Sequence, residues 1–140
     1  MNSIADAVER DPAHGDRVHF TVTRPDPTTA DALSESAKNI ARTIEAKVIV
    51  CFTSSGSTAR RIARERPGVP IMVLTPKMET ARRSGLLWGA YAVHTRDVES
   101  FEEMVGKAKR MAMRQELAAA GDRIVVCAGV PFGTPGSTNV

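Results

Sequence analysis

The residues best suited to chemistry lie in one short segment, 53–58, which reads TSSGST. An apolar run typical of a buried strand, residues 48–52, precedes it, and residues 59–64 after it have helical composition. The first N–H groups of a helix have no internal partner and carry partial positive charge, so such a corner can bind a phosphate. A glycine lets the backbone approach an oxygen closely, and hydroxyl groups add donors. These residues are Gly56, Ser54, Ser55, Ser57 and Thr58.

The corner also fits a simpler interpretation, in which it binds nothing. Ser and Thr are common N-caps of helices, so a capped strand-to-helix turn has the same composition. No GxxxxGK[ST] motif occurs in the chain, which argues against a nucleoside-triphosphate P-loop. No GxGxxG motif follows a strand, which leaves a dinucleotide site unsupported. From these residues alone, a phosphate site and an empty capped turn both remain open.

The bulk composition is that of one globular domain. The 140 residues are 42% hydrophobic and 25% charged, which is enough to bury a core. A formal charge of +3 and an aromatic content of 4%, without a basic run, do not indicate a nucleic-acid partner. No apolar run approaches the length of a bilayer span and no signal peptide is visible, so we expect a cytoplasmic protein without a membrane partner.

The cysteines and histidines do not form a recognisable metal or catalytic set. Cys51 and Cys127 each lie in an apolar, strand-like run, which favours buried reduced thiols over a disulfide or a metal site. His14, His19 and His94 lack the spacing of metal ligands. Because no Ser/His/acid or Cys/His constellation and no carboxylate pair is evident, an independent enzyme such as a phosphatase or transferase is disfavoured.

Helical and strand-like segments alternate along the chain. A short amphipathic helix at 1–10, with Ile4 and Val8 on one face, should need a packing partner. A linker at 14–27, with one short extended piece at 18–23, leads to a strong helix that Thr28 or Thr29 can cap. The other predicted helices span 59–64, 77–87 and 98–120, and the predicted strands span 48–52, 69–74, 88–94 and 123–128.

Apolar spacing predicts which face of two helices packs on the core. In the helix after Thr28, the inner face is expected to carry Leu33, Ala37, Ile40 and Ile44. The helix at 98–120, which Asp97 is expected to cap, should turn Val98, Phe101, Val105, Ala108 and Ala112 inward.

Alternating strands and helices joined by short turns predict a parallel sheet with helices on both faces. Ligands of such sheets bind at the carboxyl ends of the strands, near the switch in strand order. The corner after Phe52 and the loop after Ala128 both lie at carboxyl ends. If the first and fourth strands are neighbours, the two loops face each other, which favours the phosphate site over the empty turn.

Four separated segments resemble the C-terminal domain of pyruvate kinase. The opening MNSIADAVERD resembles the last helix of that enzyme's catalytic barrel, and TSSGSTA at 53–59 resembles its T-x-S-G-x-[ST]-A effector loop. PIMVLT at 70–75, followed by ETAR at 79–82, resembles its next strand and helix. The segments from Gly121 to Gly129 and from Gly133 to the final GSTN resemble its closing strand and loop.

The resemblance implies a three-layer α/β/α fold with a mixed, mostly parallel five-stranded sheet whose last strand is antiparallel. Residues 1–27 would be the end of the barrel helix and a linker, and residues 28–140 the C-terminal domain, with its last strand truncated. The domain would serve regulation and oligomerisation, within a homotetramer, rather than catalysis. The catalytic barrel, with its Mg and K sites and its ADP/ATP, would precede Met1, so this chain alone would hold no cofactor and transfer no phosphoryl group from phosphoenolpyruvate.

The resemblance also implies an effector site. Members of the family that bind a bisphosphate use an extra tryptophan and arginine, whereas the corresponding region, 98–115, has no Trp and basic residues that resemble a solvated face. A sugar phosphate or nucleotide monophosphate, or no effector, is therefore expected. Its phosphate would be held by Thr53, Ser54, Ser55, Gly56, Ser57 and Thr58. The closing loop would use Gly133, Thr134, Gly136, Ser137 and Thr138.

Several alternatives stay open in the sequence. Arg60 and Arg61 are as consistent with exposed helix charges as with phosphate contacts. Trp88 fits packing at an element junction or subunit contact better than stacking on a base. The partners implied by the resemblance are the barrel of the same enzyme and further copies of the domain. The other function considered is a free-standing phosphometabolite-binding module that shares the fold but has no barrel.

Overall fold

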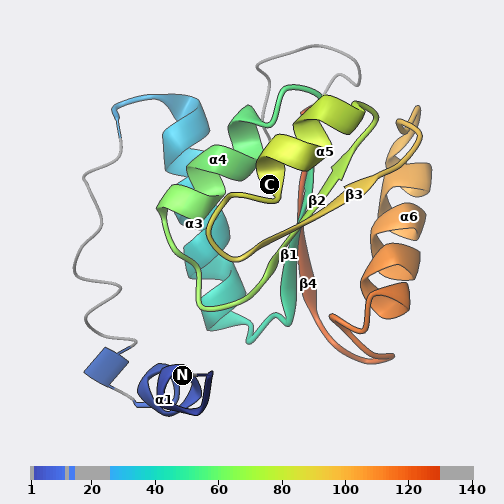
Figure 1. Ribbon diagram of the computed structural model, residues 1–140. Helices are drawn as coiled ribbons and strands as arrows, with labels where there is room; N and C mark the ends of the chain where they lie inside the picture. The colour runs from blue at the N-terminus through green and yellow to red at the C-terminus, as the bar shows by residue number, and fades with distance from the viewer. Residues whose placement is uncertain (1, 12, 15–25, 130–140) are drawn as a thin grey trace.

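A computed structural model describes residues 2–11, 13–14 and 26–129 (Figure 1). From Thr29 onward, helices and strands alternate as predicted. The helices are α1 (Asn2–Glu9), α3 (Thr29–Thr43), α4 (Ser57–Arg64), α5 (Met78–Ser84) and α6 (Phe101–Arg114). The strands are β1 (Val48–Phe52), β2 (Ile71–Thr75), β3 (Ala90–His94) and β4 (Ile124–Cys127).

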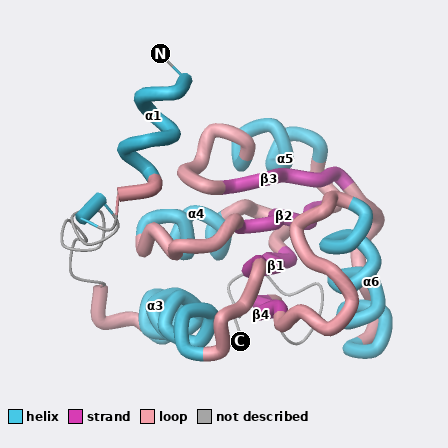
Figure 2. Tube along the Cα trace, turned by 90° about the horizontal axis from the view of Figure 1, so that it is seen from below, coloured by secondary structure: helices cyan, strands magenta, loops and turns pink. Residues whose placement is uncertain are grey.

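The strands of the described chain form one parallel, four-stranded sheet in the order β3-β2-β1-β4. Cys51 of β1 is in register with Val73 of β2 on one side and with Cys127 of β4 on the other. Figure 2 shows this order, with β1 between β2 and β4. The condition that the first and fourth strands are neighbours is therefore met. The expected fifth strand falls in residues 130–140, outside the described residues.

Helices cover both faces of the sheet, as predicted. Figure 2 shows α3 and α4 on one side of the strands and α6 on the other. Successive residues of β1 point to opposite faces, so Ile49 and Cys51 pack with α3 and α4, whereas Val48 and Val50 pack with α6. Both β1 and β2 are buried along their whole length, which their continuous apolar sequences predicted.

The last helix, α6, is shorter than predicted at both ends. It begins at Phe101 because the side chain of Ser100, not of Asp97, caps it by accepting a hydrogen bond from the Glu103 N–H at 3.1 Å. It ends before Glu116, which has a left-handed φ of 56° and stops the helical ladder. Phe101 was expected to face the core, but its side chain is 65% exposed, and Met104 packs inward in its place.

The inner face of α3 also differs from the expected one. Thr28 caps the helix as predicted. The buried face, however, runs through Asp31, Ser34, Ala37 and Ala41, while Ile40 is exposed. Because two of these buried residues are polar, an apolar pattern could not predict this face.

The other helix boundaries differ from the predictions by a few residues. α4 starts at Ser57 rather than at residue 59, and α5 spans 78–84 rather than 77–87. The predicted α1 forms, but Ile4 is 69% exposed and Val8 49% exposed, without a partner among the described residues. The extended piece expected at 18–23 lies outside the described residues.

Both cysteines are free and buried, as predicted. Burial raises the pKa of Cys127 to about 12. Burial, with Cys127 beside it, also raises the pKa of Cys51 well above its usual value. Neither thiol forms a reactive thiolate at neutral pH, so both act as small apolar residues between β1, β4 and the helices above them.

Candidate functional site

The corner at residues 53–58 lies at the point where the strand order reverses. From β1 the chain passes through α4 to β2 and through α5 to β3, whereas α6 returns it across the other face to place β4 beside β1. The switch point is therefore the boundary between β1 and β4. Because these strands are parallel neighbours, the corner after Phe52 and the chain after Cys127 leave the same edge of the sheet. This edge is where open α/β sheets bind ligands.

The corner is held in shape by its own hydroxyl groups. The Gly56 N–H donates to Thr53 Oγ1 at 2.9 Å, and the Ser57 N–H donates to Ser55 Oγ at 3.3 Å. The hydroxyl groups of Ser55 and Ser57 lie 3.0 Å apart, within hydrogen-bonding distance. Thr53 thus shapes the turn, while the two serines present adjacent hydroxyl groups at the start of α4. Both are at least partly exposed.

Gly56 has a conformation that suits glycine. Its φ is 83°, in the left-handed region, and it stands at the N-cap of α4, where it supplies no side chain to the first N–H groups. A Cβ atom at this position would lie 3.2 Å from Thr80 Cγ2 of α5. Thr80 also donates its hydroxyl hydrogen to the Ser54 carbonyl oxygen at 2.9 Å. Thr80 therefore holds the corner in place from α5, a role that the sequence did not predict.

The two arginines after the corner have different environments. Arg61 Nε lies 3.0 Å from Asp31 Oδ1 of α3, and Arg64 Nη2 lies 3.2 Å from the same atom. Arg64 Nε also pairs with Glu65 Oε1 at 3.2 Å. The carboxylates of Asp31 and Glu65 are almost fully buried. Arg61 therefore joins α4 to α3, which matches neither an exposed charge nor a phosphate contact.

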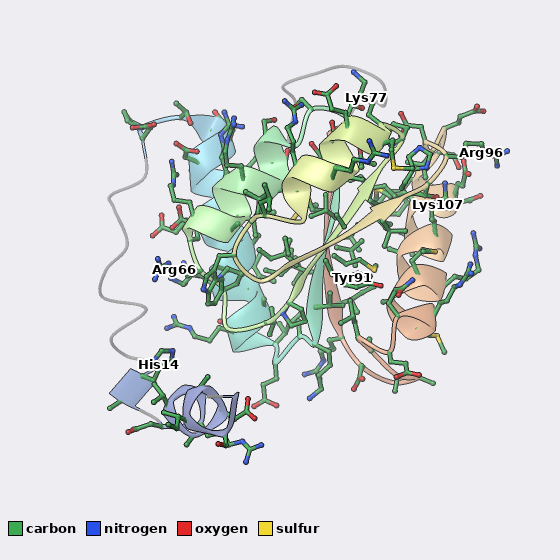
Figure 3. The ribbon with its side chains drawn as sticks, in the orientation of Figure 1. His14, Arg66, Lys77, Tyr91, Arg96 and Lys107 are labelled. Atoms are coloured by element: carbon green, nitrogen blue, oxygen red, sulfur yellow. The ribbon has the colours of Figure 1, made fainter. Side chains whose placement is uncertain are left out.

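Arg60, by contrast, is exposed and lines a small cavity beside the corner. Trp88 lies in the turn between α5 and β3, with its side chain 47% exposed. The Arg66 guanidinium, labelled in Figure 3, stands 6.0 Å from the centroid of its ring. The junction position predicted for Trp88 agrees with this placement.

The start of α6 borders the same edge of the sheet and is acidic. Hydrogen bonding from the Glu99 N–H, together with Lys107 and Arg96, holds the pKa of Glu103 below its usual value, so it stays ionised. Lys107 is buried and donates to the carbonyl oxygens of Arg96 and Asp97. Figure 3 shows Lys107 and Arg96 at this end of α6. The solvated basic face expected at 98–115 is thus wrong for Lys107.

The predicted closing loop, from Gly133 to Thr138, lies outside the described residues. Within the part of the chain that the structure describes, no group of His, Cys, Asp and Glu side chains could hold a metal ion. In that same part, the helices are too short or too polar for one of them to cross a membrane.

The parallel sheet and its glycine corner at the switch point define an open, doubly wound α/β domain. Residues 31–140 match the family model described as pyruvate kinase, alpha/beta domain. The chain therefore belongs to the pyruvate kinase family and is its C-terminal α/β domain.

Individual relatives agree with this assignment. The pyruvate kinase of Methylorubrum extorquens is 41% identical over the whole of this chain, and that of Geobacillus stearothermophilus is 34% identical over the same length. The matches cover 29% and 24% of those proteins, so the chain spans less than a third of their length. Among solved structures, Cryptosporidium parvum pyruvate kinase in complex with ADP superposes with a TM-score of 0.74 at 28% identity, covering 91% of this chain and 25% of that one.

Proposed function

We propose that this chain is the regulatory and oligomerisation domain of a pyruvate kinase, and that residues 53–58 bind the phosphate of a small effector. The observation that carries the proposal is the left-handed Gly56 at the N-cap of α4, placed where β1 and β4 diverge. The first N–H groups of α4 and the hydroxyl groups of Ser55 and Ser57 provide neutral donors for an anion.

The effector in this proposal is a sugar phosphate or nucleotide monophosphate. The region 98–115 has no Trp, and its first turn carries the acidic residues Glu102 and Glu103, which supports a single phosphate rather than a bisphosphate. The loop at 133–138 would close over the ligand. In the full-length enzyme, this domain would pack against its partner copies in two alternative arrangements. The effector would change activity only if it binds one of these arrangements more tightly than the other.

The remaining parts of the proposal follow from family membership. Residues 1–27 would join the domain to a catalytic barrel that contains the Mg, K and ADP/ATP sites, so this chain alone would not transfer a phosphoryl group. Copies of the domain would pair in a cytoplasmic homotetramer. Coupling between effector and barrel would pass through that pairing.

A calorimetric titration tests the effector site. We expect at least one of ribose 5-phosphate, glucose 6-phosphate and AMP to bind the folded chain. Ser57→Glu should abolish that binding, because it places a carboxylate where the phosphate would lie. Ser36→Glu, on the exposed side of α3, is the matched control and should bind as the unmodified chain does. Failure of all three ligands, or unchanged affinity in Ser57→Glu, would overturn the proposal.

A further inference from the structure

A small cavity of about 130 Å³ lies beside the corner, between α4 and α5. Ser55, Gly56 and Arg60 line it from the corner and α4, and Arg83 and Ser84 line it from α5. Neither Ser57 nor any residue of β4 lines it, so this cavity lies on the α5 side of the corner, away from β4.

Ser84 supplies a hydroxyl group to the lining of this cavity. The residue is 3% exposed, and its Oγ lies 3.6 Å from the point where a Cβ of Gly56 would stand. Among the described residues, this hydroxyl group makes no hydrogen bond, unlike the neighbouring Thr80, which donates to the Ser54 carbonyl oxygen. Its Oγ is not sealed from solvent, so its donor is available to a ligand in the cavity.

Two guanidinium groups from different helices stand at the rim. Arg60 is exposed, and no carboxylate of the described residues pairs with it. Arg83 forms an ion pair with Glu79 at 3.5 Å, but both side chains are largely exposed. Exposed pairs of this kind contribute little to stability, so Arg83 can exchange Glu79 for an anion in the cavity at small cost.

We propose that this cavity, on the α5 side of the corner, binds a small tetrahedral oxyanion such as inorganic phosphate, at a position distinct from the effector phosphate although it shares Ser55 and Gly56 with the effector site. Arg60 and Arg83 contact the anion from two sides, and the Ser84 hydroxyl group donates to it. Pockets for drug-sized ligands have volumes of about 300–1,000 Å³, so a nucleotide or sugar bisphosphate is too large for this one. Guanidinium groups suit the oxygens of phosphate because they donate several hydrogen bonds in one plane.

Titration of the whole chain with inorganic phosphate tests the proposal, with ribose 5-phosphate as a second ligand. Arg83→Gln should weaken phosphate binding about tenfold or more, because a charge-assisted contact is lost. Ser84→Ala should weaken it in the same direction. Arg82→Gln removes the same charge from the same helix, outside the cavity, and should leave the affinity unchanged. Ribose 5-phosphate, as a corner ligand, should bind all three variants equally.

Three outcomes would overturn the proposal. The first is an absence of phosphate binding, and the second is equal affinity in Arg83→Gln and Arg82→Gln, which would place the anion elsewhere. The third is an equal loss of phosphate and ribose 5-phosphate binding in Arg83→Gln, which would show that the cavity binds the phosphoryl group of the effector itself. Failure of ribose 5-phosphate alone would count against the effector site and leave the cavity supported.

Discussion

Replacing Asp31 by alanine is expected to lower the free energy of unfolding by about 2–3 kcal/mol. The Asp31 carboxylate is buried between α3 and α4, where a single oxygen contacts both Arg61 and Arg64. Its removal leaves two guanidinium groups without their shared anion. The expected loss is smaller than the 3–5 kcal/mol typical of a fully buried pair, because both arginine side chains are about one-third exposed and water can hydrate them.

Urea denaturation followed by circular dichroism measures this effect. Glu35→Ala removes a carboxylate from the exposed side of the same helix, and its effect should stay within about 0.5 kcal/mol. If Asp31→Ala proves as stable as Glu35→Ala, the contacts of Asp31 do not stabilise the packing of α3 on α4.

Gly56→Ala is expected to cost about 2 kcal/mol of stability and to weaken effector binding more than about tenfold. An L-residue at a φ of 83° is strained, and its Cβ would lie only 3.2 Å from Thr80 Cγ2. Relief of that contact must shift either the corner or α5. Such a shift would move the first N–H groups of α4 away from the phosphate.

Gly89→Ala separates backbone strain from the contact with Thr80. Gly89 has a similar φ of 65°, but a Cβ there would meet nothing within 4 Å. This variant should lose about 1 kcal/mol, from strain alone, and should retain effector binding. Equal losses in the two variants, with binding preserved in both, would show that close packing at Gly56 is unimportant.

Both predictions concern the placement of α4. The ion pairs to Asp31 hold its middle and end against α3, and Thr80 supports the corner before its first turn. A helix fixed in this way starts at the switch point without further ordering, and its Ser57 N–H, which donates to Ser55 Oγ at 3.3 Å, would exchange that acceptor for the anion. Preorganisation of this kind lowers the entropic cost of binding a small anion.

The centre of the fold could be predicted because its signals are local. The continuous apolar runs at 48–52 and 71–75 have the composition of strands buried on both faces, and both are buried throughout. The turn at Gly56 combines a glycine with hydroxyl residues after a strand, which also predicted the corner. The neighbourhood of β1 and β4 needed an assumption about strand order, which the parallel pairing confirms.

Other features depend on contacts between distant residues. The inner face of α3 includes Asp31 because Arg61 and Arg64 lie opposite it, some 30 positions along the chain. Lys107 is buried because two backbone carbonyl groups accept its hydrogens. The start of α6 did carry a local signal, since Ser100 and Glu103 have the spacing of a capping box, but Asp97 offered a competing cap.

The most direct test of the proposed phosphate-binding site at the start of α4 is a titration of the ¹⁵N-labelled chain with ribose 5-phosphate, followed by amide chemical shifts. We predict that the largest changes occur at the N–H groups of Gly56, Ser57 and Thr58, where the ligand would meet the start of the helix. If the largest changes instead occur at the opposite edge of the sheet, near Lys47 and Gly68, phosphate binding at this corner is contradicted. Unchanged spectra at saturating ligand would contradict it as well.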